Sequence, residues 1–168
     1  MGNIYLVGFM GTGKTATGKV LSKSLKRAFF DMDELIEERE KMTIPDIFEK
    51  KGEPYFRALE KEVVKELAKK NDLVIACGGG AFVDPENIEN MKASGKVIWL
   101  TSSPEMILDR TKKFTHRPLL NVKDPLVRIK DLLAKREPFY SQAHCVIDCD
   151  KLSVEQSAEA VLRCLDEV

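Results

Sequence analysis

Residues 8–15 read Gly8-Phe9-Met10-Gly11-Thr12-Gly13-Lys14-Thr15, and this stretch decides the fold. It matches the pattern G-x-x-x-x-G-K-[ST], in which the backbone N–H groups of a glycine-rich loop cradle phosphate oxygens. An apolar run at 4–7 precedes the loop, and a segment with helical spacing follows at 14–26. The loop is therefore predicted to join a buried strand to a helix, where the helix dipole favours an anion. We expect Lys14 to reach the outer phosphates of a nucleoside triphosphate and the Thr15 hydroxyl to bind Mg²⁺. The alternative is a turn that binds nothing, and the loop alone does not separate kinase from GTPase or motor.

Short apolar runs alternate with helical patterns along the rest of the chain. The predicted strands are 4–7, 28–32, 73–77, 97–100 and 145–147. The predicted helices are 14–26, 33–41, 45–70 with a break at Gly52-Glu53-Pro54, 84–93, 103–113, 125–140 and 153–167. This alternation is typical of βαβ units, so we predict an α/β fold with a parallel, doubly wound sheet. Ligands of such sheets bind beyond the carboxyl ends of the strands.

Composition excludes several classes of protein. The chain has 168 residues with 27 Lys plus Arg and 27 Asp plus Glu, so its formal net charge is zero. This balance favours neither a nucleic-acid nor a membrane-surface protein, and no apolar stretch is long enough to cross a membrane. The chain enters its first strand at once, so no secretory signal is expected. With four cysteines, two histidines and no C-x-x-C pair, we expect buried, reduced thiols in a cytosolic protein and no Cys/His metal site.

An acidic pair follows the second predicted strand. Phe30-Asp31-Met32-Asp33 reads as the end of an extended segment, in which positions i and i+2 point to the same side. Asp31 and Asp33 would then face the phosphate loop together. One carboxylate could hold the water shell of Mg²⁺ and the other could accept a proton from an attacking hydroxyl. The alternative is that one of them only caps the helix that follows.

Glycines and arginines supply further candidates. Gly78-Gly79-Gly80 follows the third strand, where successive glycines suit a close approach of the backbone to a ligand, or else form a loose turn. Arg57 stands three residues before Glu60 and Arg136 stands near a helix end. Taken singly, Arg57 is explained by a surface ion pair with Glu60 and Arg136 by a favourable contact with the helix dipole, so neither arginine would be selected as a site residue on its own.

The stretch from Arg110 to Asp124 is basic, contains Pro118 and lacks apolar periodicity. A loop of this length in a compact domain is usually functional or disordered. We predict a mobile lid at about 112–124 that closes over nucleotide phosphates. The alternatives are a solvated surface loop and, with less support, a nucleic-acid contact, because no aromatic residues accompany the charges.

Together these motifs resemble the shikimate kinase family over the chain up to about Ile147. The phosphate loop, the acidic pair and the glycine triplet occur in the family's order. The remaining elements resemble its F-R-x-x-E, lid and R-x-P-x-Y motifs, which read here as Phe56 to Glu60, Thr115 to Leu120 and Arg136 to Tyr140.

The resemblance implies a three-layer α/β/α P-loop kinase of one domain, residues 1–168, with a five-stranded parallel sheet and a shikimate-binding helical region at about 33–61. It implies transfer of the γ-phosphate of ATP to the 3-hydroxyl of shikimate, with Mg²⁺, in a cytoplasmic monomer. Catalysis is assigned to Lys14, Asp33 and Arg117, and Mg²⁺ binding to Thr15 and, through water, Asp31. The nucleotide is assigned to Gly11, Thr12, Gly13, Lys14, Thr15, Ala16, Arg110 and Arg117. Shikimate is assigned to Asp33, Arg57, Gly78, Gly79, Gly80 and Arg136.

Two departures from the family pattern stand out. Cys77 occupies a position where Thr or Ser is expected to support a metal-bound water, and Lys151 to Ser153 supplies no clear basic residue beside the adenine. The rival interpretations are another small-molecule P-loop kinase (for gluconate or a nucleoside monophosphate), a GTPase-like switch protein and a non-catalytic nucleotide-binding domain. The switch protein is disfavoured because Asn121-Val122-Lys123-Asp124 has the wrong order for N-K-x-D.

Overall fold

A computed structural model describes residues 2–112 and 122–168 of the chain. Its centre is a five-stranded sheet in the order β2-β3-β1-β4-β5, and every neighbouring pair is parallel. The strands are β1 (Asn3–Val7), β2 (Ala28–Asp31), β3 (Leu73–Ala76), β4 (Gly95–Thr101) and β5 (Cys145–Asp148). The predicted parallel sheet is confirmed, and β4 begins two residues earlier than the sequence indicated.

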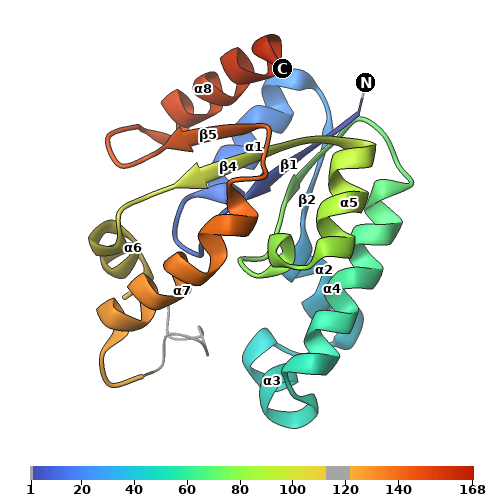
Figure 1. Cartoon of the computed structure of the whole chain (residues 1–168). Helices are drawn as coiled ribbons and strands as arrows, with labels where there is room; N and C mark the ends of the chain where they lie inside the picture. Colours follow the sequence, from blue (N-terminus) through green and yellow to red (C-terminus); the bar gives the residue numbers. More distant parts are fainter. Residues whose placement is uncertain (1, 113–121) are drawn as a thin grey trace.

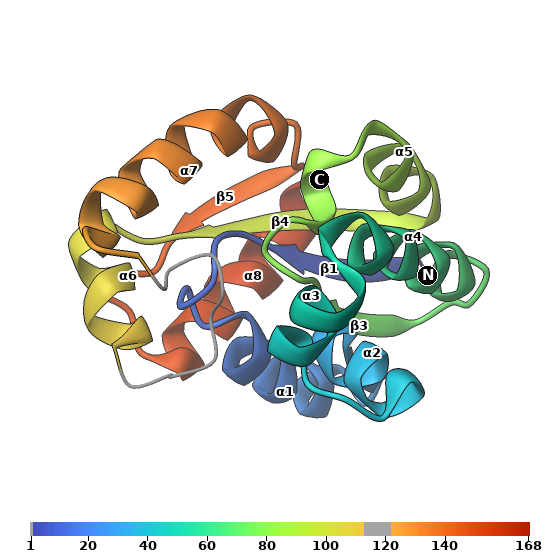
Figure 2. The same cartoon turned by 90° about the horizontal axis from the view of Figure 1, so that it is seen from below.

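Helices cover both faces of the sheet (Figures 1 and 2). Helices α1 and α8 lie on one face, and α4, α5 and α7 lie on the other, so the three-layer prediction is also confirmed. The helices are α1 (Lys14–Leu25), α2 (Met32–Glu40), α3 (Ile44–Lys51), α4 (Glu53–Ala68), α5 (Pro85–Ser94), α6 (Pro104–Thr111), α7 (Pro125–Tyr140) and α8 (Val154–Glu167). A short 3₁₀ turn, η1 (Ala81–Val83), was not predicted. None of the described helices is both long and apolar enough to span a membrane.

Alternation along β1 divides the core between the two faces. Ile4 and Leu6 pack in the cluster with α1 and α8, whereas Tyr5 and Val7 pack in the cluster with α4 and α5. All five residues of the central strand β1 are buried, so the strand is mostly apolar on both of its faces. Its rigidity fixes the loop that leaves its carboxyl end at Gly8.

Local sequence signals set the helix boundaries. The side chains of Ser103 and Asp124 accept hydrogen bonds from the first turns of α6 and α7, and a proline stands at the start of each helix. Ser153 and Gln156 form a reciprocal capping box at α8. Gly52 adopts φ = 85° between α3 and α4, which is the break predicted there.

The expected geometry of the acidic pair was wrong. β2 ends at Asp31, and Met32 is already the first residue of α2, so Asp33 lies in the first helical turn. The alternation rule for strands therefore does not relate Asp31 to Asp33. The Asp31 side chain accepts from the N–H of Glu34, which is the capping role weighed as the alternative.

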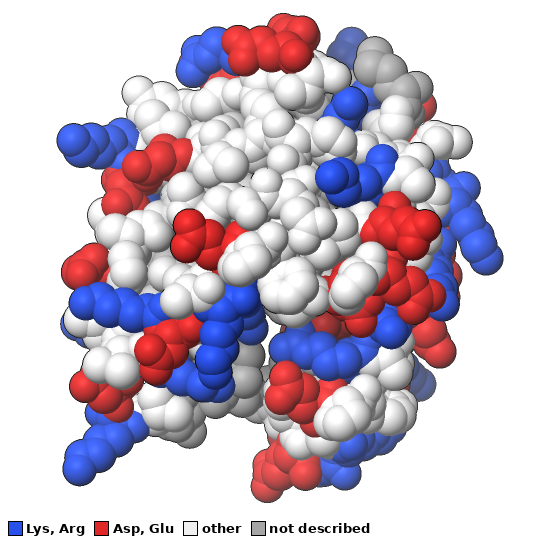
Figure 3. All heavy atoms as spheres, in the orientation of Figure 1, with Lys and Arg blue, Asp and Glu red and all other residues white. Residues whose placement is uncertain are grey.

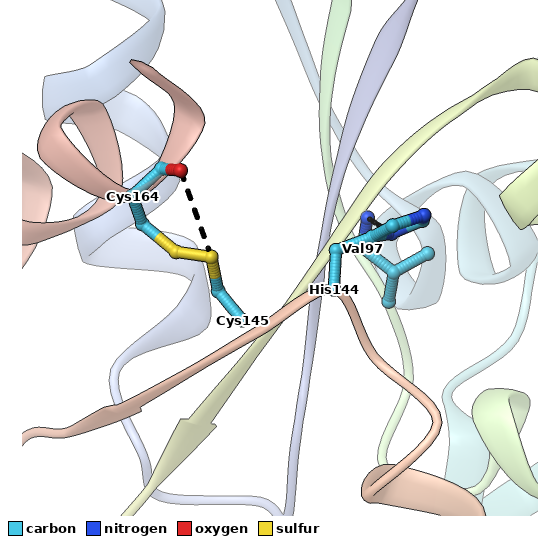
Figure 4. The surroundings of a disulfide bond; sticks show 4 residues. All are labelled: Val97, His144, Cys145 and Cys164. Atoms are coloured by element: carbon cyan, nitrogen blue, oxygen red, sulfur yellow. Dashed lines mark hydrogen bonds between the residues drawn. A yellow bond between two sulfur atoms is a disulfide. The ribbon is translucent and has the colours of Figure 1, made fainter. Parts of the chain in front are cut away.

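The expectation for the cysteines was only partly right. Cys77 and Cys149 are buried thiols, but Cys145 of β5 and Cys164 of α8 form a disulfide (Figure 4). Beside this disulfide, the Val97 N–H donates to His144 Nδ1 at 3.0 Å and the His144 N–H donates to the Val97 carbonyl at 2.8 Å. Both contacts lie where β5 begins, at the opposite end of the strand from the phosphate loop.

Candidate active site

The phosphate loop curls because glycine occupies its left-handed positions. Gly11 and Gly13 have φ values of 81° and 90°, and a Cβ on Gly8 would clash with the Leu100 carbonyl. Lys14 Nζ donates to the carbonyls of Gly8 and Phe9 at 2.6 and 2.9 Å. The ammonium group thus lies inside the curl, where the α1 amino terminus adds positive potential.

The loop contacts the end of β2 through one short hydrogen bond. The Thr15 hydroxyl donates to Asp31 Oδ2 at 2.6 Å. Asp31 Oδ1 meanwhile accepts from the Glu34 N–H at 3.1 Å. One carboxylate therefore both caps α2 and touches the P-loop threonine, so the two roles weighed for this residue are compatible.

Two carboxylates flank the first residue of the glycine triplet. A Cβ on Gly78 would lie 2.9 Å from Asp33 Oδ1 and 2.8 Å from Glu60 Oε2. Glu60 is buried, and its Oε2 has no hydrogen-bond partner among the described residues. Burial raises the pKa of Glu60 to about 7, with Arg57 opposing the rise and Asp33 adding to it.

Two arginines lie against the other two glycines. Arg57 Nη1 donates to Glu60 Oε1 at 2.6 Å, and the Arg57 guanidinium carbon is 2.7 Å from where a Gly80 Cβ would stand. Arg136 Nη1 is 3.3 Å from the corresponding Gly79 position. A side chain at Gly80 would displace the Arg57 guanidinium from this position, and one at Gly79 would crowd Arg136.

Arg136 is a buried cation. Its side chain is 7% exposed, its guanidinium carbon lies 5.3 Å from the Phe9 ring centre, and its Nη1 has no hydrogen-bond partner within the described structure. An unpartnered buried donor of this kind is costly unless a ligand supplies an acceptor. Arg136 is therefore prepared for an anion.

These groups line one cleft of about 740 Å³ at the carboxyl ends of the strands, a volume typical of small-molecule sites. Figure 3 shows the hollow at the lower edge of the molecule, with basic and acidic side chains on both sides. Arg110 borders it and donates to the Gly11 carbonyl at 3.1 Å. A wider hollow of about 1330 Å³ lies near the amino ends of the strands, but no candidate residue lines it.

The structure gathers most of the candidate residues in this cleft. The cleft is lined by Gly11, Thr12, Gly13, Lys14, Thr15, Ala16, Asp31, Asp33, Arg57, Gly79, Gly80, Arg110 and Arg136. Gly78 stands beside it, between Asp33 and Glu60. Arg117 and most of the predicted lid, 113–121, lie outside the described residues.

Sequence reasoning missed two features of the cleft. Glu60 was considered as half of a possible surface pair and as the last residue of the F-R-x-x-E motif but was given no role in the site, yet its side chain is 2% exposed. Leu152, Val154 and Ser157 form a wall beside Cys149, which no motif indicated. Cys77, which the sequence marked as a departure from the family pattern, lines the cleft, and burial raises the pKa of its thiol well above the usual range, so it stays protonated.

Comparison with known proteins agrees with this geometry. The family model described as shikimate kinase matches residues 10–166. A curated shikimate kinase from Caldanaerobacter subterraneus is 46% identical over 163 residues, covering 97% of this chain and 95% of the relative. A solved shikimate kinase from Acinetobacter baumannii in complex with shikimate has a TM-score of 0.96 and 41% identity, covering 99% and 94%. A gluconokinase from Sinorhizobium meliloti has a TM-score of 0.64 at 16% identity over 99% of this chain and 92% of its own, which shows a shared fold alone.

Proposed function

The chain belongs to the shikimate kinase family, and on this premise we propose how its residues transfer the γ-phosphate of ATP to the 3-hydroxyl of shikimate. The products are 3-phosphoshikimate and ADP, and the reaction serves the chorismate pathway to aromatic amino acids. The similarity to the gluconokinase does not support gluconate as the acceptor, because at 16% identity it shows only a shared fold.

Two arginines that meet at the glycine triplet carry this proposal. Arg57 and Arg136 lie against Gly80 and Gly79, and Arg136 keeps a buried donor unpartnered among the described residues. Planar guanidinium groups bind carboxylates in forked, charge-assisted pairs. A small acid such as shikimate supplies the carboxylate, whereas the hydroxyl groups of a neutral sugar accept hydrogen bonds but leave the buried positive charge uncompensated.

Asp33 is the group proposed to accept the proton of the attacking hydroxyl. It lines the cleft in the first turn of α2, next to Gly78 and facing the same space as the phosphate loop. A carboxylate there can orient the substrate hydroxyl and draw its proton as the phosphorus–oxygen bond forms. Lys14, in the loop, is proposed to stabilise the charge that builds on the transferred phosphoryl group.

Thr15 and Asp31 fit Mg²⁺ by their chemistry. They present a hydroxyl and a carboxylate oxygen 2.6 Å apart, and hard oxygen donors of this kind suit Mg²⁺, which usually keeps several waters and takes few protein ligands. We assign Thr15 as the direct ligand and Asp31 as a ligand through water. When bound, the ion neutralises phosphate charge and aligns the leaving group.

Further assignments rest on the family resemblance. Arg117 would reach the phosphates from the lid, and Arg110 would flank the adenine from its place beside Gly11. We further propose a single domain over 1–168, with the acceptor bound by the region 33–61, and a monomer that works in the cytoplasm without nucleic-acid or membrane partners. Light scattering at the chain mass of 19.0 kDa would test the monomer.

An acceptor panel tests the activity. ADP release is measured with ATP and Mg²⁺ while shikimate, gluconate or AMP is offered in turn, and the product of the shikimate reaction is identified by its mass. Of the three acceptors, we expect only shikimate to cause ADP release, and we expect the mass of its product to show one added phosphate. Equal release without acceptor, or a faster rate with gluconate or AMP, would overturn the proposal. The Lys14→Met variant serves as the control for contaminating kinases.

A further inference from the structure

Tyr140 reaches the glycine triplet from the end of α7. It is fully buried, and its hydroxyl donates to the Gly79 carbonyl. Its ring packs against Trp99 of β4, with ring centres 5.4 Å apart. Burial raises the pKa of Tyr140, so the hydroxyl remains a proton donor throughout the physiological range. Packing therefore holds the Tyr140 ring in place, with its hydroxyl directed at the carbonyl of Gly79.

That peptide group stands where the two halves of the cleft meet. A Cβ on Gly79 would lie 3.3 Å from Arg136 Nη1, 3.5 Å from the Met10 nitrogen and 3.8 Å from the Gly8 carbonyl oxygen. The substrate arginine is thus on one side of Gly79 and the phosphate loop is on the other. Because three successive glycines restrict their own backbone weakly, its orientation needs an outside restraint.

The restraint comes from the same helix face as Arg136. Tyr140 and Arg136 are four residues apart on α7, so their side chains are neighbours. The Arg136 guanidinium also interacts with the Tyr140 hydroxyl and opposes the rise of its pKa. One turn of α7 therefore carries both Arg136, which is proposed to bind the substrate carboxylate, and Tyr140, which binds the adjacent Gly79 peptide.

We propose that Tyr140 is a positioning residue for the acceptor: its hydroxyl fixes the Gly79 peptide and so sets the geometry of the acceptor site relative to Arg136 and the phosphate loop. This inference rests on the proposed function, because it concerns the binding of the acceptor. The nucleotide half of the cleft is formed mainly by α1 and the loop itself. Loss of the Tyr140 hydroxyl should therefore weaken acceptor binding and spare ATP binding.

The test compares two tyrosine variants that each lose one buried hydroxyl. Tyr140→Phe removes the contact to Gly79. Tyr5→Phe is the matched control, because Tyr5 is equally buried and its hydroxyl contacts Ser94 Oγ at 2.7 Å and Asn3 Nδ2 at 3.2 Å, away from the cleft. Both variants should lose stability to a similar degree, so stability alone does not distinguish them.

Kinetics separate the outcomes. In Tyr140→Phe we expect the KM for shikimate to rise about tenfold, the scale of one buried hydrogen bond with its acceptor left unpaired, while the KM for ATP stays within about twofold. Tyr5→Phe should keep both constants. Unchanged KM for shikimate in Tyr140→Phe, or an equal rise for ATP, would overturn the inference.

A parallel assay of the wild type and a calorimetric measurement of shikimate affinity separate failure of this inference from failure of the proposed function or loss of stability. Wild-type enzyme is assayed in parallel, since a wild type inactive on shikimate refutes the proposed function rather than the role of Tyr140. All three proteins are assayed well below the lowest melting temperature of the set, and shikimate affinity is also measured by calorimetry without ATP. A calorimetric affinity equal to that of the wild type would likewise overturn the inference.

Discussion

The Thr15 hydroxyl donates to Asp31 Oδ2 across 2.6 Å, while the other oxygen of the same carboxylate caps α2. One aspartate thus joins the start of α1 to the start of α2. Thr15 is the last residue of the phosphate loop, and the proposed base, Asp33, lies between Asp31 and Glu34 in the first turn of α2. This side chain of Asp31 therefore ties the phosphate loop directly to the helix that carries the proposed base.

Replacing Asp31 by Asn should separate its two roles. Asn caps helices as well as Asp does, so α2 should persist, but the negative charge near the proposed Mg²⁺ is lost. We expect the apparent Mg²⁺ requirement to rise about 10- to 100-fold, as is typical when an outer partner of a metal is removed. The measurement is a Mg²⁺ titration of the initial rate at saturating ATP and shikimate. Asp84→Asn, at the cap of α5, is the control, and an unchanged titration in Asp31→Asn would remove Asp31 from the metal site.

Asp33→Asn should abolish most of the turnover while ATP still binds. General-base assistance is worth about 10²- to 10⁴-fold in rate, and the amide preserves the size of the side chain beside Gly78. Turnover is followed by ADP release, and ATP affinity by calorimetry. Turnover near that of the wild type would exclude Asp33 as the base. An equal loss of ATP affinity would point instead to a displaced phosphate loop.

The strand pattern and the phosphate loop could be predicted from the sequence because both depend on local signals. Apolar runs fix the strands, and glycine spacing fixes the curl from Gly8 to Gly13. The acidic pair shows where such reasoning fails: D-x-D was assigned strand geometry, but the cap at Asp31 starts a helix immediately. β2 ends one residue earlier than predicted, so the helical geometry of α2, and not the alternation of a strand, relates Asp31 to Asp33.

The rest of the site depends on contacts between distant segments, which no local pattern encodes. Glu60 looks like half of a surface pair until α4 packs beside the triplet and buries it. Tyr140 enters the sequence analysis only as the last residue of the R-x-P-x-Y motif, and the approach of α7 to Gly79 is what makes its hydroxyl relevant. The Cys145–Cys164 disulfide likewise follows from the packing of α8 on β5 rather than from cysteine spacing.

Truncating either substrate arginine should weaken shikimate binding far more than ATP binding. Removing one partner of a buried charge pair costs about 3–5 kcal/mol, against about 0–1 kcal/mol for an exposed pair. Arg57→Met and Arg136→Met are therefore expected to raise the dissociation constant for shikimate at least 100-fold. Arg39→Met, which breaks an exposed pair with Glu66, is the matched control. Unchanged shikimate affinity in both site variants would mean that the carboxylate binds elsewhere.

Glu60 should make the stability of the unliganded protein fall as pH rises. Burial raises its pKa in the folded state to about 7 from the ordinary value of 4.5, so the folded protein binds the extra proton. The contribution of this group is full below about pH 4.5 and is lost as pH rises through 7, at no more than about 1.4 kcal/mol per pH unit.

Urea unfolding at pH 5.5, 6.5 and 7.5 measures this effect. The stability of the wild type relative to Glu60→Gln should decline along the series, because glutamine does not titrate. Glu66→Gln removes a carboxyl whose pKa is lowered by Arg39, and should show no such decline. Parallel curves for wild type and Glu60→Gln would contradict a protonated Glu60 at this site.

The disulfide should stabilise the protein without affecting turnover. It joins residues 19 positions apart in the sequence and links the first residue of β5 to α8, at the end of the strand away from the cleft. A loop of this length corresponds to about 3 kcal/mol in the chain-entropy description, or about 6–12 °C in melting temperature for a domain of this size. Dithiothreitol should lower the melting temperature of the wild type by that amount and leave kcat at 25 °C unchanged. The Cys164→Ser variant should melt at the lower temperature with or without reductant, since it has no bond to lose.

Alkylation of the unfolded, unreduced protein should modify two thiols, those of Cys77 and Cys149. Modification of all four cysteines without reductant would contradict the bond, and the thermal effect would then have to come from packing between β5 and α8 alone.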